Sequence, residues 1–308
     1  MRYLIVGGSG FVGSFFVDAL MAQKHEVTVY DNLSGGKKEF IAHHLSNPKF
    51  KFIEGDMLDL PLLQTVMKKK EFVIHLAANP DVRNFGDEDY KRDTQGMKNV
   101  LIAMKDNKIK KLAFSSTSAV YGETQQIPTP ESAPLQPISQ YGKSKVENEK
   151  MIAEHCAIFD VQAWIFRFAN VIGSRGTHGV IVNFIDKLKA NSKELEIMGD
   201  GKQSKSYVLV QDCVAAVLQM IQHSKDFVNI CNVGNEDWVA VHRIAEIVSE
   251  EMGLQPTFKF LGGDRGWEGD IPKMRLSIDK IKALGWKPTC GSEQAVRKTV
   301  KALLNENI

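Results

Sequence analysis

Short apolar runs alternate with longer stretches of helical periodicity along the first 115 residues. The apolar runs predict buried strands at residues 3–6, 25–30, 50–56, 71–77 and 111–115. The stretches between them predict helices at residues 11–23, 37–45, 58–68 and 90–106. In the first of these, Val12, Phe16 and Leu20 recur every fourth residue. Regular strand–helix alternation predicts parallel strands joined by right-handed crossovers, hence an α/β fold with a doubly wound sheet.

The pattern is less regular in the second half of the chain. It predicts helices at residues 143–156 and 183–190, a strand and turn at 195–201, and strands at 207–210 and 227–233. The last strand is expected to return to the main sheet. We therefore predict a Rossmann-like domain at residues 1–170, rejoined by about 208–235, and a smaller mixed α/β domain at residues 171–207 and 236–308.

A glycine turn joins the first predicted strand to the first predicted helix. Gly7 permits a tight turn, Gly10 allows a pyrophosphate to approach the backbone, and Gly13 lets the helix pack closely on the strand. Backbone N–H groups at the start of the helix, at Phe11 and Val12, are placed to meet negative charge. Strand, turn and helix together predict a dinucleotide-binding domain.

Asp31 and Asn32 end the second predicted strand, roughly 20 residues beyond the glycines. At that position an adenosine ribose presents its 2′-hydroxyl. A carboxylate accepts a hydrogen bond from this hydroxyl and repels a 2′-phosphate, so Asp31 predicts NAD in preference to NADP.

The remaining cofactor contacts are predicted where later strands end, at Asp56, Met57, Leu76, Ala77, Ala78 and Ser115. Asp56 and Met57 are expected beside the adenine ring, and Asp56 is also expected to cap the helix that follows. The small residues after the fourth strand let the backbone pass close to the dinucleotide. Ser115 belongs to a polar cluster at the carboxyl end of the fifth strand, where ligands of such sheets bind.

Tyr141 and Lys145 are four residues apart, so both project from one face of a predicted helix. A free phenol, with a pKa of about 10, is a poor base at neutral pH. A nearby ammonium, together with an oxidised nicotinamide, is expected to lower the pKa of Tyr141. Thr117, at the end of the fifth strand, is expected to hold a substrate hydroxyl beside Tyr141. The order glycine turn, Asp31, Thr117, Tyr141 predicts an NAD-dependent catalytic site.

Composition excludes several other classes of protein. The 308 residues are 43% hydrophobic with a net charge of +2, and no aromatic residues interleave with the scattered lysine clusters, so nucleic acid is not an expected partner. The four cysteines are widely separated, which predicts neither disulfides nor a metal centre. The start of the chain does not resemble a secretory signal and no apolar run is long enough to span a bilayer. We therefore expect a cytoplasmic protein with no membrane partner.

These motifs carry a resemblance that runs nearly end to end. The chain resembles the extended short-chain dehydrogenase/reductases and, among them, nucleotide-sugar epimerases of the UDP-glucose 4-epimerase type. The matching segments are 7–13 (GGSGFVG), 31–34 (DNLS), 75–78 (HLAA), 115–117 (SST), 120–122 (VYG), 141–145 (YGKSK) and 167–173 (RFANVIG). The resemblance implies NAD-dependent epimerisation of a UDP-linked sugar through a 4-keto intermediate, with Thr117, Tyr141 and Lys145 as catalytic residues.

The resemblance also implies residues on the substrate side. Asn170 matches an asparagine near the substrate diphosphate, Lys205 stands where the family has a phosphate-contacting arginine, and Arg265 falls in an Arg-x-Gly-Asp-like segment. The sequence differs from the family pattern at two positions expected near the cofactor. Pro80 stands where bacterial epimerases usually have a lysine, and Asp93 stands where an asparagine is common. Family members pair two helices across a two-fold axis, so a homodimer is expected, although the apolar faces of those helices could equally pack on the protein's own sheet.

Other readings of the same motifs stay open. A dehydratase of nucleotide sugars carries an Asp-Glu pair after its catalytic threonine, whereas Ser118 and Ala119 follow Thr117. A nucleotide-sugar decarboxylase and a net dehydrogenase, such as a threonine dehydrogenase, are further alternatives within the superfamily. A dinucleotide-sensing protein without turnover would need the glycine turn but neither Tyr141 nor Lys145.

Overall fold

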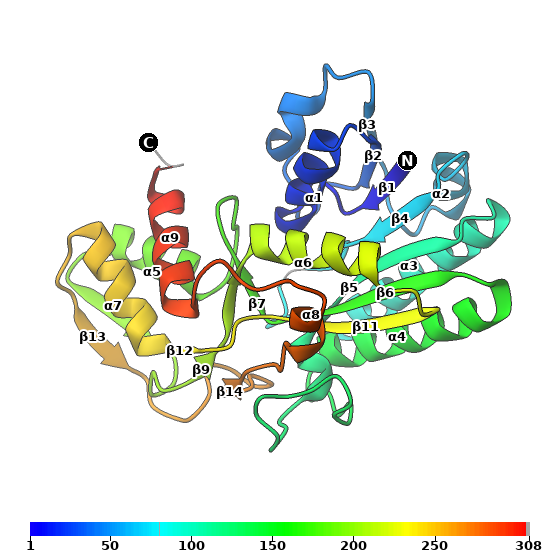
Figure 1. The fold of residues 1–308 in the computed structure, drawn as a ribbon. Helices are drawn as coiled ribbons and strands as arrows, with labels where there is room; N and C mark the ends of the chain where they lie inside the picture. Colours follow the sequence, from blue (N-terminus) through cyan, green and yellow to red (C-terminus); the bar gives the residue numbers. More distant parts are fainter. Residues whose placement is uncertain (80, 306–308) are drawn as a thin grey trace. The chain divides into compact units, whose positions relative to one another are not determined.

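Seven strands form one sheet in the computed structural model, which describes residues 1–79 and 81–305 (Figure 1). The order across the sheet is β11-β6-β5-β4-β1-β2-β3, and the pairs from β3 to β5 are parallel. This is the doubly wound order predicted from the alternation of strands and helices, extended at one edge by the returning strand. The strands are β1 (Arg2–Val6), β2 (Glu26–Asp31), β3 (Phe50–Glu54), β4 (Phe72–His75), β5 (Lys111–Thr117), β6 (Gln162–Phe168) and β11 (Val228–Val233). The departure at Pro80 lies outside the described residues.

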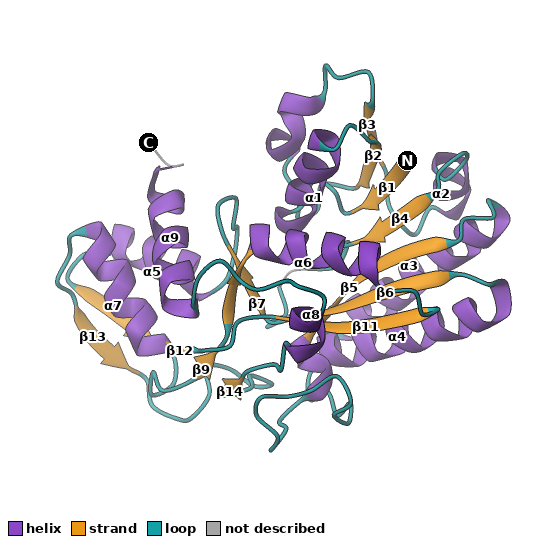
Figure 2. Cartoon of the chain, in the orientation of Figure 1, coloured by secondary structure: helices purple, strands orange, loops and turns teal. Residues whose placement is uncertain are grey.

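The helices between these strands begin and end within a few residues of the predicted positions (Figure 2). They are α1 (Phe11–Ala22), η1 (Lys38–His44), α2 (Leu60–Val66), α3 (Asp87–Asp106) and α4 (Gln140–Phe159). A short 3₁₀ helix that was not predicted, η2 (Ser118–Tyr121), follows β5 directly. The segment predicted as a helix at residues 37–45 is a 3₁₀ helix. The predicted cap of α2 was wrong: Asp59 and not Asp56 occupies the N-cap, where its carboxylate accepts from the Leu62 N–H at 3.0 Å.

The protein consists of two compact units, each formed by more than one segment of the chain. Unit 1 comprises Met1–Val120, Gln140–Arg167 and Val217–Cys231, and unit 2 comprises Tyr121–Ser139, Phe168–Ala216 and Asn232–Ile308. The assignment of one domain to the cofactor and the other to the substrate stays a prediction. In the part of the chain that the structure describes, no helix has the length and apolar character needed to cross a bilayer.

The core of unit 1 explains the apolar faces of α3 and α4. Met97, Leu101 and Met104 of α3 and Ile152 of α4 are buried in one cluster with side chains of β1, β4 and β5. Burial of these side chains against their own sheet accounts for the periodicity. The expected homodimer therefore rests on the family resemblance and stays a prediction.

Unit 2 is built from short strands and three principal helices around a separate core. Its elements are β7 (Asn170–Ile172), α5 (Val180–Ala190), β8 (Glu194–Ile197), β9 (Ser204–Lys205), β10 (Tyr207–Leu209), β12 (Val239–Ala240), α7 (Val241–Met252), β13 (Thr257–Phe260), β14 (Lys273–Met274), α8 (Asp279–Ala283) and α9 (Ser292–Asn305); α6 (Val210–His223) continues from unit 2 into unit 1. The strands pair as β10-β7, β12-β9-β14 and β13-β8.

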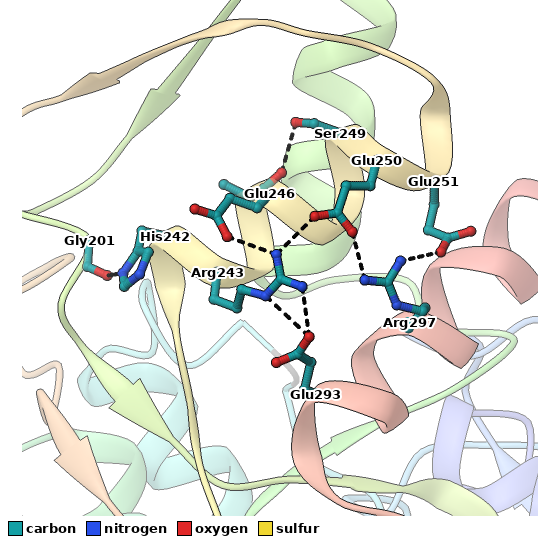
Figure 3. Close-up of polar contacts among 10 residues, drawn as sticks. Gly201, His242, Arg243, Glu246, Ser249, Glu250, Glu251, Glu293 and Arg297 are labelled. Carbon is teal, nitrogen blue, oxygen red and sulfur yellow. Dashed lines mark hydrogen bonds and ion pairs between the residues drawn. The ribbon is translucent and has the colours of Figure 1, made fainter.

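An ion-pair network joins α7 to α9 on the surface of unit 2 (Figure 3). The Arg243 guanidinium donates to Glu250 at 2.9 Å and to Glu293 at 2.7 Å. Arg297 donates to Glu250 at 2.6 Å and to Glu251 at 2.5 Å. Because Glu250 accepts from both arginines, the pairs support one another, which makes the network more stabilising than isolated exposed pairs.

Candidate active site

The glycine turn after β1 has two glycines that the fold itself requires. Gly7 has φ +84°, and a Cβ on it would lie 2.6 Å from the backbone nitrogen of Ala77. A Cβ on Gly13 would overlap the carbonyl oxygen of Gly7. Gly10 is different, because a Cβ there would meet among the described residues only the Gly7 oxygen, at 3.3 Å. The space next to Gly10 therefore fits a close approach by a ligand, as predicted for a pyrophosphate.

Helix α1 begins directly after this turn. Its N-cap is Gly10, which has no side chain to accept from the first N–H groups of the helix, at Phe11 and Val12. The amino end of the helix thus presents backbone donors and the positive end of the helix dipole, the arrangement that binds phosphate.

Asp31 ends β2 beside the glycine turn. Its carboxylate accepts from the Ser9 N–H at 2.9 Å and from the Leu33 N–H at 2.8 Å. The residue is only 8% exposed, and burial raises the pKa of Asp31 despite these two hydrogen bonds. Each carboxylate oxygen has capacity for a second hydrogen bond. The residues around the turn therefore fit a dinucleotide whose ribose keeps both hydroxyl groups.

A second polar group lies where β3 ends. Asn32 donates to the Asp56 carboxylate at 3.0 Å, Arg92 pairs with the same carboxylate, and the Leu58 N–H donates to it at 2.9 Å. Burial opposes ionisation, but these contacts outweigh it and lower the pKa of Asp56. Met57 packs against α3, where a Cβ on Gly96 would overlap it. Asp56 therefore holds Asn32 and α3 together, and its contact with adenine stays a prediction.

The backbone after β4 passes close to the glycine turn. The N–H groups of Leu76 and Ala77 both donate to the Val6 carbonyl, at 2.8 and 3.1 Å. The Ser115 hydroxyl donates to the His75 carbonyl at 3.4 Å. The predicted contacts at Leu76, Ala77 and Ser115 thus gather at the carboxyl ends of β1, β4 and β5; Ala78 follows directly in the chain.

Thr117, Tyr141 and Lys145 come together in unit 1. Thr117 ends β5, and its side chain hydrogen-bonds the Tyr141 phenol on α4. The Lys145 ammonium lies 5.5 Å from the centre of the Tyr141 ring. The rings of Phe85 and Tyr141 pack in a T-shaped arrangement with their centres 5.3 Å apart. The structure therefore brings together the three side chains that the sequence predicted as catalytic.

A buried carboxylate accompanies this group, and its role was missed in the sequence. Asp93 of α3 pairs with Lys145 at 3.2 Å, and the Asn148 amide donates to its other oxygen at 2.8 Å. The side chains of Asp93 and Lys145 are 2% and 1% exposed. Asn148 was detectable as the residue one helical turn after Lys145 on the same face of α4.

The surroundings of Tyr141 differ from the expectation of a lowered pKa. Burial raises the pKa of the phenol and Asp93 raises it further, whereas Lys145 and the hydrogen bond with Thr117 lower it. Burial has the largest effect, so the pKa of Tyr141 is raised in this structure. His75 is fully buried on β4 and is also repelled by the charge of Lys145 when it is protonated. Burial, together with Lys145, lowers the pKa of His75 to about 4.

The predicted substrate residues of unit 2 are each engaged by the protein. Asn170 donates from its amide to the Ser206 carbonyl at 3.1 Å. Lys205 pairs with the Asp270 carboxylate. Arg265 pairs with Glu123 and donates to the Asp270 carbonyl at 3.0 Å. Lys205 and Arg265 therefore meet at Asp270, while their contact with a diphosphate stays a prediction.

Comparison with known proteins confirms the resemblance inferred from the motifs. The model of the NAD dependent epimerase/dehydratase family matches residues 3–234. A protein of Methanocaldococcus jannaschii with the provisional name UDP-glucose 4-epimerase is 34% identical over 313 residues, which cover 99% of each chain. UDP-glucuronic acid decarboxylase 2 of Arabidopsis thaliana is 32% identical over 98% of this chain and 68% of its own length.

Solved structures share the fold over the whole chain. A UDP-galactose 4-epimerase is 38% identical with a TM-score of 0.90, covering 99% of both chains. The UDP-glucose 4-epimerase of Thermotoga maritima, solved with UDP-glucose, is 31% identical with a TM-score of 0.88, covering 100% of both chains.

Proposed function

Since the chain belongs to the NAD dependent epimerase/dehydratase family, we propose that it is a nucleotide-sugar 4-epimerase that interconverts UDP-glucose and UDP-galactose. Membership in this family makes the protein an enzyme of the nucleotide-sugar epimerase/dehydratase class. NAD is the cofactor of the family, which confirms the cofactor predicted from the glycine turn and Asp31.

The observation that carries the proposal is the grouping of Thr117, Tyr141 and Lys145 beside the carboxyl ends of β4 and β5. The glycine turn and the start of α1 would hold the cofactor pyrophosphate, and Asp31 would accept from the adenosine ribose. When bound, the NAD⁺ would supply the acceptor for a hydride from the sugar carbon and, after reduction, the donor that returns it. Tyr141 takes the proton of the sugar hydroxyl as general base, while Thr117 orients that hydroxyl and Lys145 stabilises the phenolate.

Return of the hydride and the proton completes an epimerisation. The 4-keto sugar would turn over in the site, so that the hydride returns to the opposite face of the sugar carbon while Tyr141 donates its proton back to the carbonyl oxygen. Tyr141 begins and ends the cycle in the same protonation state, so no external acid or base is needed. Asn170, Lys205 and Arg265 would bind the substrate diphosphate in this scheme, as positively charged or amide donors do.

A 4-epimerase is favoured over a dehydratase by the residues that follow Thr117. Water elimination needs an additional acid and base at the neighbouring carbon. Ser118 and Ala119 occupy these positions, and the Ala119 N–H donates to the Thr117 hydroxyl at 3.2 Å. The segment therefore supplies no carboxylic acid next to Thr117.

The test is to incubate the purified enzyme with UDP-galactose and to separate the products by anion-exchange chromatography. We expect UDP-glucose to form without net growth of the NADH absorbance band. UDP-N-acetylglucosamine and UDP-glucuronic acid, assayed in parallel, distinguish a different 4-epimerase from a decarboxylase. Stoichiometric NADH release with threonine, and no conversion of any nucleotide sugar, would overturn the proposal and leave the fold unaffected.

A further inference from the structure

Two adjacent histidines converge on one carboxylate at the surface of unit 1. His43 and His44 belong to η1, and Asp18 belongs to α1. The Nε2 atoms of both imidazoles lie 2.8 Å from the same oxygen, Oδ1 of Asp18. In residues 1–79 and 81–305 this is the one group of three or more His, Cys, Asp or Glu ligand atoms that all lie within 4.8 Å of one another.

This convergence is unusual for neighbouring residues. Successive side chains of a 3₁₀ helix point about 120° apart, because the helix has three residues per turn. Here the two rings lie with centres 4.1 Å apart, and the His44 ring also packs on Phe50 at 5.7 Å. The side chain of His44 is 16% exposed and that of Asp18 is 30% exposed, whereas that of His43 is 50% exposed. One side of the group is therefore held by the protein and the other is open to water.

We propose that Asp18, His43 and His44 bind a divalent transition-metal ion, with Zn²⁺ the best fit. Two imidazole nitrogens and one carboxylate oxygen are the ligands of many open zinc sites, in which water fills the fourth position. Zinc bonds of about 2.0–2.2 Å place the ligand atoms of a tetrahedral site roughly 3.3–3.5 Å apart. Starting from 2.8 Å, the nitrogens need to move away from the oxygen by only about half an ångström.

Metal binding at this site replaces two hydrogen bonds. In the metal-free protein each imidazole donates an Nε2–H to the carboxylate. In the bound form both Nε2 atoms direct a lone pair at the ion, with the ring protons on Nδ1. Our expectation of no metal centre rested on the spacing of cysteines, and no sequence motif links Asp18 to residues 25 and 26 positions away.

The site connects two segments that flank the predicted cofactor pocket. Helix α1 begins at the glycine turn, and the segment leading into η1 is attached to that turn because the Lys37 N–H donates to the Ser9 carbonyl at 2.9 Å. An ion bound by Asp18 and both histidines would link η1 to α1. The three ligands come together only in the folded state, so the ion would bind the folded protein and not the unfolded chain. It should therefore raise thermal stability, whether or not the proposed enzymatic function is correct.

The experiment uses the full chain without a histidine tag, freed of metal by chelator dialysis. Zinc chloride is titrated by calorimetry, and thermal unfolding is followed with and without the ion. We expect one saturable site per chain and a rise of several degrees in Tm at saturating zinc. His44→Ala should abolish both effects, and Asp18→Asn, which keeps the shape of the side chain, should weaken them.

His25→Ala is the matched control, because the Met1 amino group lies 3.3 Å from His25 Nδ1 and forms a competing pair of nitrogen ligands. This variant should bind zinc like the wild type. A cooperative unfolding transition of each metal-free variant shows that it folds. Absence of saturable binding, or binding that survives His44→Ala and Asp18→Asn but is lost in His25→Ala, would overturn the proposal.

Discussion

Replacing Asp93 with asparagine tests how the buried charges of unit 1 set the basicity of Tyr141. The substitution removes one negative charge and keeps an oxygen that can accept from Lys145, which lies 3.2 Å from the carboxylate. Asp93 raises the pKa of Tyr141, so its removal should lower that pKa. Because the phenolate is the proposed base, the acid limb of the kcat/KM profile should move to lower pH.

The size of the shift follows from two distances. Lys145 Nζ is 3.2 Å from the carboxylate and 5.5 Å from the centre of the phenol ring, so Asp93 lies within about 9 Å of that ring. At an effective dielectric constant of about 20, one charge at about 9 Å changes the phenolate energy by about 2 kcal/mol. Water in the site weakens this, and we expect a shift of about one pH unit.

Two measurements make the prediction independent of the substrate. The first is kcat/KM against pH with the best nucleotide sugar. The second is the near-ultraviolet phenolate absorbance of wild type minus that of Tyr141→Phe, which reports the phenol directly even if the substrate assignment is wrong. Glu149→Gln is the control, because Glu149 is also buried, on α4, but pairs with Arg167 at 2.6 Å. An acid limb that stays in place or moves to higher pH in Asp93→Asn would refute the reasoning.

Three further predictions concern single residues. Tyr141→Phe should lower turnover by at least about a hundredfold while leaving NAD binding, followed by fluorescence titration, unchanged; near-normal turnover would remove Tyr141 from the mechanism. Wild type should have a lower Kd for NAD than for NADP. Asp31→Asn should bring the two Kd values closer together, because the asparagine carries no charge to repel a 2′-phosphate. The same ratio of the two Kd values in wild type and variant would show that Asp31 does not face the ribose. His75, whose ring nitrogens find no partner among the described residues, has its pKa lowered to about 4. The unfolded state therefore binds the extra proton more readily, and about 3 kcal/mol of the unfolding free energy should be lost as pH falls from about 6.5 to about 4. Denaturant unfolding of His75→Phe should lack this part of the acid loss; the same pH dependence as wild type would contradict it.

The fold was predictable because its signals are local and repeated. Each strand of the main sheet is a short apolar run, and each crossover helix has its own periodicity, so errors at single boundaries did not change the topology. The roles of Gly7 and Gly13 were also predictable from a local signal, because a Cβ cannot be placed at either position without overlapping the backbone. The cap of α2 was also detectable: Pro61 fixes the first turn, and Asp59 immediately precedes that turn.

The charged contacts were not predictable, because they join residues far apart in the chain. Asp93 was recognisable as a departure from the family pattern, but its partner Lys145 is 52 positions away and is set by the packing of α3 on α4. The convergence of His43 and His44 on Asp18 depends in the same way on how η1 packs on α1. Sequence periodicity specifies which face of a helix is buried, whereas the pairing of polar groups depends on rotation and register between helices.

The exposure of each proposed functional cation indicates how readily it can exchange its carboxylate for a ligand. Lys145 and Asp93 are almost fully buried, so separating them leaves an uncompensated charge, and the pair should persist through the reaction. Lys205 is 22% exposed against a buried Asp270 and should move little. Arg265 is 36% exposed and Glu123 is 46% exposed, and an ion pair of this kind contributes little to stability. Arg265 is therefore the cation that can leave its carboxylate for a bidentate contact with phosphate, while Lys205 keeps Asp270 in place behind it.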